Sequence, residues 1–277
     1  MQSISQVGAV SVKTTSSYLS FVIKLWAFVA LIGQWMFAAY ILIQFALPFF
    51  SGSLSSENTQ HMIRGIVEGD TSGNAILISH LLSALVLSTS GILQLFPYIR
   101  IQFPLFHKWN GRLFLVLGIM GALTGLYLTL IKGSRLSDIG AIGVCLNGIL
   151  ILIFAALAWK YALKKQFQKH MRFAIHTFIL VNGVWTFRLY MMGWYLVNQG
   201  PNGNNATIDG PADLIMSFAC YLLPMAMAEV YFWAQKRRDR KSYFVVSTTA
   251  TIGCAITIVG VVAATMMMWW PRISAGL

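Results

Sequence analysis

Seven long apolar stretches divide the chain, and polar segments rich in Lys and Arg separate them. A helix that crosses a membrane needs roughly 20 mainly apolar residues. Each stretch meets that length, so the sequence predicts an all-α, polytopic membrane protein whose solvent is the lipid bilayer. The seven predicted transmembrane helices lie near Phe21–Phe50, Ala75–Pro97, Leu113–Ile131, Ile139–Trp159, Phe173–Val197, Ala212–Ala234 and Tyr243–Trp270.

The composition supports this class. The chain is 57% hydrophobic and 10% charged, whereas soluble domains usually carry about 25% charged residues. The polar pieces between the predicted helices are too short to bury a core of their own, so residues 1–277 are expected to form a single transmembrane domain. The polar N-terminal segment lacks the pattern of a cleaved signal peptide. We therefore expect the first helix to be an uncleaved anchor.

The basic residues indicate the orientation. Cytoplasmic loops of membrane proteins carry the excess of Lys and Arg, and here the excess falls in every second gap. With the N-terminus inside, only Arg64, Lys132, Arg135 and Arg272 lie outside, and Arg188 lies within the fifth helix. This predicts a multi-pass protein of the bacterial inner membrane with a cytoplasmic N-terminus and a periplasmic C-terminus. The net charge of +12 is then a topology signal and does not favour nucleic-acid binding.

Two histidine-bearing segments open predicted helices at the cytoplasmic side: His107-Lys-Trp-Asn-Gly-Arg112, and Lys169-His-Met-Arg-Phe173. With His80, Gln94 and the Thr-Phe-Arg ending in Arg188, they resemble a family of predicted bacterial inner-membrane proteins described only as a domain of unknown function. The resemblance covers about residues 75–190. A more distant likeness, to cytochrome b561-type proteins, implies that helices two to five form a four-helix core holding b haems between histidine pairs.

Polar side chains at membrane depth carry the functional information, because burying them is costly. His80 lies on a small or polar face of the second helix. His107 and His170 lie at the cytoplasmic ends of the third and fifth helices. His176 is about 9 Å further into the membrane than His170, and the two point about 120° apart, so a shared ligand requires partners from different helices. Alternatively, His80 bonds to a neighbouring helix, and His107 and His170 meet lipid phosphates.

Imidazoles from two helices can hold a b-type haem. The candidate iron ligands are His80, His107 and His176, with His170 as a further cofactor contact. These histidines do not securely provide the four ligands of two haems, which favours one site or none. Arg188 either snorkels or contacts an anion such as a propionate, a quinone carbonyl or a substrate carboxylate. The residues that can pair with haem propionates are Arg100, Arg112 and Arg172.

Glu229 is the single carboxylate well inside a predicted membrane helix, and Pro224 predicts a kink just before it. A buried carboxyl group can carry a proton, so Glu229 is a candidate for a proton path. The alternative is an ion pair with a basic residue at the cytoplasmic rim. Gly121 and Gly125 form a GxxxG pattern, which predicts close helix packing in the third helix.

Three functions remain open. The leading hypothesis is a b-type haem or quinone-linked electron-transfer protein, and hence a possible transmembrane oxidoreductase that works with a quinone or a redox partner protein. The second is a proton-coupled transporter or permease in which His80, His176, Arg188 and Glu229 line a path. The third is an accessory subunit of a larger membrane complex, whose polar residues lock helices together.

Overall fold

The computed structural model describes residues 3–276, with side chains from Ser17 onward. Every regular element among these residues is helical. The elements are α1 (Ser3–Ile41), the π-helical turn η1 (Leu42–Ala46), α2 (Leu47–Ser51), the 3₁₀ turn η2 (Glu57–Thr59), α3 (Thr71–Ser90), the 3₁₀ turn η3 (Gly91–Leu95), α4 (Pro97–Gln102), α5 (Pro104–Leu130), α6 (Asp138–Leu163), α7 (Phe167–Val181), α8 (Gly183–Asn198), α9 (Pro211–Arg237), α10 (Arg240–Ala264), the π-helical turn η4 (Thr265–Trp269) and α11 (Trp270–Ala275).

Six helices in the described part of the chain are long and apolar enough to cross a membrane. They span Ser17–Ser51, Thr71–Leu95, Pro104–Leu130, Asp138–Leu163, Pro211–Arg237 and Arg240–Ala275. These correspond to six of the seven stretches predicted from hydropathy. The remaining stretch, near Phe173–Val197, is helical but is divided into α7 and α8.

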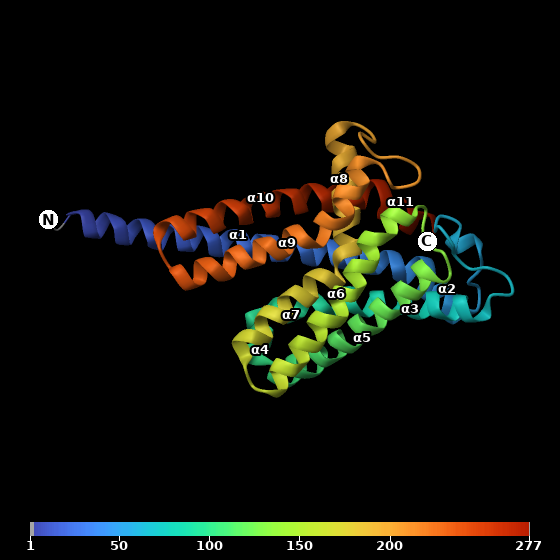
Figure 1. Ribbon diagram of the computed structural model, residues 1–277, viewed down its shortest axis with the longest axis horizontal. Coiled ribbons are helices and arrows are strands. Elements are labelled where there is room, and N and C mark those ends of the chain that lie inside the picture. The colour runs from blue at the N-terminus through green and yellow to red at the C-terminus, as the bar shows by residue number, and fades with distance from the viewer. Residues whose placement is uncertain (1–2, 277) are drawn as a thin grey trace.

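The division lies at Asn182, whose backbone has a ψ of 8°. Its side-chain amide donates to the carbonyl of Phe178 at 2.8 Å and so competes with the regular helix bonds. Neighbouring helices supply further partners: Gln34 of α1 donates to Asn182 Oδ1 at 2.6 Å, and Asn147 of α6 donates to the carbonyl of Leu180 at 3.1 Å. At membrane depth a broken helix requires such partners, because lipid offers none. After the break α8 takes a different direction from α7 (Figure 1).

The helices form two groups. In the first, α3 packs on α5, α5 on α6, and α6 on α7, which is the predicted association of helices two to five. In the second, α10 packs on α1, α8 and α9, and Figure 1 shows α1 and α10 side by side along the long axis. The break at Asn182 therefore moves the second half of the fifth predicted helix out of the four-helix group and against α10.

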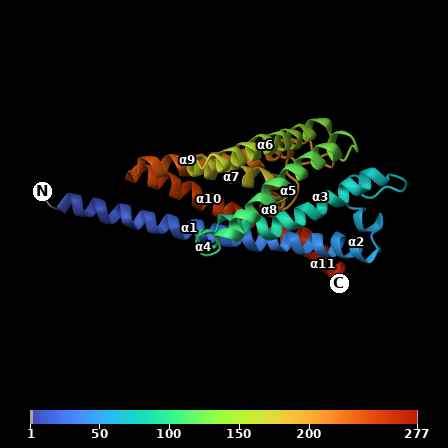
Figure 2. The same cartoon turned by 90° about the horizontal axis from the view of Figure 1, so that it is seen from below.

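The two ends of the molecule differ in what they hold. One end, called the basic end here, holds the N-terminus and the turn between α9 and α10, with Arg237, Arg238 and Arg240. The other, called the distal end, holds the C-terminus and the loop that follows α2 (Figures 1 and 2).

Glycine allows one particularly close helix crossing. A Cβ on Gly260 of α10 would lie 2.7 Å from Leu189 Cβ and 2.9 Å from the Leu189 carbonyl oxygen of α8. The GxxxG pattern of α5 is different, because a Cβ on Gly121 would meet nothing within 4 Å, and one on Gly125 would meet only the His80 ring, at 3.4 Å. The prediction of close packing is therefore wrong at Gly121, whereas Gly125 lies at van der Waals distance from His80.

Candidate functional site

A carboxylate, a guanidinium and an imidazole meet between α7 and α9. Arg172 and His176 are four residues apart on α7, so they share a face of that helix. Arg172 Nε donates to Glu229 Oε1 at 2.8 Å, and its Nη2 pairs closely with Glu229 Oε2. His176 Nε2 lies 2.6 Å from Glu229 Oε1. Glu229, two turns before the end of α9, thus contacts both side chains.

The imidazole is the most enclosed member of this cluster. His176 is 4% exposed, and the rings of Phe154 and Phe232 approach it edge-on at centroid distances of 5.5 and 6.3 Å. Because Glu229 accepts the Nε2 hydrogen, Nδ1 carries the lone pair of a neutral ring. That buried atom has no hydrogen-bond partner among the described residues. Nδ1 is therefore the ring nitrogen of His176 that is left without a contact.

Glu229 pairs with a basic side chain, as the alternative reading of the sequence predicts. The partner is Arg172, in a fork geometry in which two nitrogens face two carboxylate oxygens. Arg172, one of the arginines predicted to pair with a haem propionate, therefore pairs with the carboxylate of Glu229. Pro224 lies inside α9, five residues before Glu229.

His107 lies in the first turn of α5, and His170 lies in the first turn of α7. Their tautomers differ. With its amide oriented to satisfy all its neighbours, Gln94 donates to His107 Nδ1 at 2.9 Å, so the His107 proton is on Nε2. His170 Nδ1 donates to the Ala158 carbonyl at 2.9 Å, which leaves the lone pair on Nε2.

His80 has the same tautomer as His170. Its Nδ1 lies 2.9 Å from Thr124 Oγ1, and that hydroxyl donates its hydrogen to the Met120 carbonyl at 2.7 Å. The His80 nitrogen must therefore be the donor, with the lone pair on Nε2. This confirms that His80 bonds to a neighbouring helix, the alternative that the sequence left open.

Three of the arginines considered for a cofactor have different contacts. Arg188 Cζ lies 5.3 Å from the centre of the Phe37 ring, and Nη1 donates to the Val184 carbonyl at 3.3 Å. Arg112 stacks on Trp109 at 4.7 Å, at the start of α5. Only Arg172 joins the cluster with His176 and Glu229.

These contacts bear on whether the histidines fit a haem. Two facing imidazoles, each with a free ring nitrogen, are needed for a bis-histidine b haem. His176 Nε2 bonds to Glu229, which leaves Nδ1 as its free nitrogen, whereas His107 accepts from Gln94 at Nδ1 and carries its proton on Nε2. Among the described residues no group of three or more His, Cys, Asp or Glu side chains is placed to hold a metal ion. His80 and His170 have a suitable tautomer, and a haem between histidines stays a prediction.

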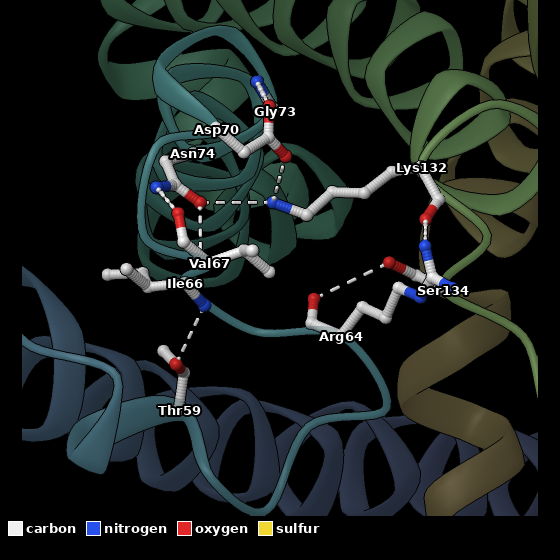
Figure 3. A network of polar contacts seen from close by, with 9 residues as sticks. All are labelled: Thr59, Arg64, Ile66, Val67, Asp70, Gly73, Asn74, Lys132 and Ser134. Atoms are coloured by element: carbon white, nitrogen blue, oxygen red, sulfur yellow. Dashed lines mark hydrogen bonds and ion pairs between the residues drawn. The ribbon is translucent and has the colours of Figure 1, made fainter.

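A second polar network joins two loops at the distal end (Figure 3). Lys132 Nζ lies 3.2 Å from Asp70 Oδ2 and donates to Asn74 Oδ1 at 3.1 Å, with the Lys132 side chain 3% exposed. Arg64 donates to the Lys132 carbonyl at 2.9 Å. Hydrogen bonds from the Gly73 amide and from Lys132 hold the pKa of Asp70 below its ordinary value. The network fixes the loop before α3 to the loop after α5.

Sequence reasoning missed several buried polar residues. The sequence predicts only that Lys132 lies outside the membrane and does not reveal its burial, nor that of Asp213, which is 1% exposed in the first turn of α9. Asp213 accepts from the Asn204 side chain at 2.5 Å. Gln34 and Asn147, which support the helix break, are amides with apolar or small neighbours inside apolar stretches. That isolation was the signal that could have revealed them.

Comparison with known proteins establishes the family. A family model described as "Predicted membrane protein (DUF2306)" matches residues 77–233, more than half of the chain. The chain belongs to this family. No curated protein matches it, and no solved structure does. The DUF2306 region contains His80, His107, His170, His176 and Glu229, whereas α1 and α10 lie outside it. The family agrees with the first resemblance drawn from the sequence, and the likeness to cytochrome b561-type proteins stays a prediction.

Proposed function

We propose that this DUF2306 protein is a seven-span transporter that couples solute movement to a proton carried by His176 and Glu229. The observation that carries the proposal is the contact of His176 with Glu229 in membrane-embedded helices, with His176 Nδ1 free to accept a proton. Ionisable groups in membrane helices commonly mark proton relays and substrate pathways. In this proposal His176 gains and loses the proton, and its contact with Glu229 is kept in both states.

The broken helix supports the same function. Transporters often place their sites at discontinuous transmembrane helices, whose ends expose backbone groups inside the protein. Here α7 carries Arg172 and His176, and it ends at the break that Gln34 and Asn147 support. We propose that α7 and α8 together form the seventh span. The N-terminus is then cytoplasmic and the C-terminus is on the outer face.

In the proposed cycle, a proton enters at His176 Nδ1 and converts the neutral ring to an imidazolium. Glu229 stays ionised because both Arg172 and the imidazolium face its carboxylate. Loss of the proton restores the neutral ring. Arg172 keeps the cluster positively charged when His176 is protonated, which favours release of the proton.

The test measures proton movement into liposomes that hold a pH-sensitive dye, driven by a potassium gradient with valinomycin. Wild-type protein is expected to exceed protein-free liposomes, and Glu229→Gln and His176→Gln are expected to abolish the excess. Both variants keep a polar side chain of similar size. The control is Glu68→Gln, an exposed loop carboxylate, which should retain full movement. Absence of movement in the wild type, or unchanged movement in Glu229→Gln, would overturn the proposal.

Electron transfer is the second candidate, favoured by the tautomers of His80 and His170. In each ring Nδ1 bonds to an oxygen and leaves Nε2 available, the arrangement usual for ligating histidines. The absorbance of protein purified with haem supplied during expression tests this candidate. A Soret band with a sharpened α band on dithionite, lost in His170→Ala, would support it, and a colourless preparation would exclude it.

A further inference from the structure

Arg188 lacks an acidic partner. Its contacts are the Val184 carbonyl and the face of Phe37. Tyr40 and Arg272 act electrostatically on the Arg188 guanidinium, and neither of them is a carboxylate. No carboxylate forms an ion pair with it among the described side chains. A guanidinium in a membrane helix is costly unless an acceptor meets it.

A donor without a hydrogen-bond partner lies beside the same phenyl ring. Trp269 is 0% exposed, and its indole Nε1 has no hydrogen-bond partner among the described residues. Its ring packs on Phe37 at a centroid distance of 5.6 Å. An indole nitrogen is a donor only, so it also requires an acceptor. Phe37 thus contacts both Arg188, whose charge has no carboxylate partner, and Trp269, whose Nε1 has no hydrogen-bond partner among the described residues.

Both π-helical turns of the protein's described part lie at this place. Such turns carry an extra residue per turn and occur frequently at functional sites. η1 packs on α11, and η4, which contains Trp269, packs on α1. Gln44 of η1 donates to the Arg272 carbonyl at 2.5 Å, and Arg272 Nη1 donates to the Met268 carbonyl at 2.6 Å. The two widened turns therefore hold the ends of the first and last spans together next to Arg188.

His61 connects this region to the loop after α2. Its Nε2 lies 2.6 Å from the hydroxyl of Tyr40, which is buried on α1, while the His61 residue itself is exposed. Partial burial, with the positive charges of Arg272 and Arg188, lowers the pKa of His61 below its ordinary value. The positive charges of Arg188 and Arg272 therefore act on His61, an exposed residue.

We propose that Arg188, Arg272 and Trp269 bind the carboxylate of a small organic acid, with its apolar body against Phe37 and Phe45. A guanidinium matches a carboxylate in geometry and charge. Phe45 packs on Tyr40 at 5.5 Å, and Tyr40 packs at 6.2 Å on Phe37, the ring that Arg188 and Trp269 contact. This inference rests on the proposed function, because it names the class of solute that the transporter would carry. Its residues, however, are separate from His176 and Glu229.

Benzoate is the probe, because it joins a carboxylate to an aromatic body. Calorimetric titration of the full-length protein in detergent is expected to show binding. Arg188→Gln and Trp269→Phe should each weaken it tenfold or more, the second while keeping a ring in place. Arg112→Gln is the matched control, since that arginine stacks on Trp109 away from this site. Circular dichroism melting of each variant confirms that it is folded.

The outcomes separate the two proposals. No benzoate binding by the wild type, or equal binding by all variants, overturns the organic-acid site. Binding of phosphatidylglycerol in place of benzoate, lost in Arg188→Gln, also overturns it and assigns the arginines to a lipid phosphate. Benzoate binding that persists in Glu229→Gln, with proton movement lost, supports two separate sites. Wild-type proton movement without benzoate binding rejects only this inference.

Discussion

At the scale of single residues, the network around Lys132 shows how burial makes the two partners of an ion pair unequal. The Lys132 side chain is 3% exposed, whereas that of Asp70 is 34% exposed. Removing Asp70 leaves an ammonium group buried with Asn74 as its remaining side-chain partner. Removing Lys132 leaves a carboxylate that solvent and the Gly73 amide can still satisfy. A buried charge without its partner is the more costly state.

We therefore predict that Asp70→Asn lowers the melting temperature more than Lys132→Met does. Asparagine keeps the cap on Gly73, so its effect reports the lost charge. Methionine keeps most of the buried stem of Lys132. Circular dichroism melts in detergent measure both variants and the double variant, which should be more stable than Asp70→Asn alone. A double variant less stable than either single one would contradict this account.

Acid should weaken the same network. The pKa of Asp70 is lowered by the Gly73 amide and by Lys132. A carboxyl group with a depressed folded-state pKa contributes stability above its unfolded value, and that contribution is lost as the pH falls through the folded value. We predict that the melting temperatures of wild type and Asp70→Asn differ at pH 7 and converge as the pH falls below about 4. A constant difference down to pH 3 would exclude Asp70 as the source.

At the scale of helices, hydropathy predicted six spans well because length and apolarity are local properties of the sequence. The break at Asn182 depends instead on Gln34, 148 positions away in the chain, and on Asn147. The candidate site shows the same contrast. The spacing of Arg172 and His176 puts them on one face of α7, but Glu229 lies 53 or more positions away in the chain, and its contact with them depends on how α7 packs on α9. The GxxxG pattern did not show which of its glycines meets a neighbour: Gly125 lies against the His80 ring, and Gly121 meets nothing within 4 Å.

Glycine positions give a prediction at this scale. Gly260→Ala places a Cβ 2.9 Å from the backbone oxygen of Leu189, which cannot move independently of α8. Overpacking of this kind costs about 1–3 kcal/mol. Gly121→Ala meets nothing within 4 Å and should change stability by no more than about 1 kcal/mol, in the stabilising direction. Thermal melts of both variants check the difference, and equal destabilisation would contradict the close crossing of α8 and α10.

At the scale of the whole molecule, the broken helix pair decides the topology. If α7 and α8 cross the membrane together, then the turn before α7 and the loop after α8 lie on opposite sides. If the pair enters and returns on one side, they lie on the same side. The distribution of basic residues favours a crossing, because the turn holds Lys164 and Lys165 whereas the loop 199–210 holds no basic residue.

Cysteine labelling of intact cells tests this topology. In a background with Cys145, Cys220 and Cys254 changed to alanine, a membrane-impermeant maleimide should label Asn202→Cys but label Lys165→Cys only after permeabilisation. Both positions are exposed, so protection reports the membrane and not burial. Ser53→Cys, on the loop after α2, should label with Asn202→Cys because an even number of spans then separates the two loops. Labelling of Lys165→Cys and Asn202→Cys from the same side would show that α7 and α8 do not cross, and the proton pair on α7 and α9 would then require a different path.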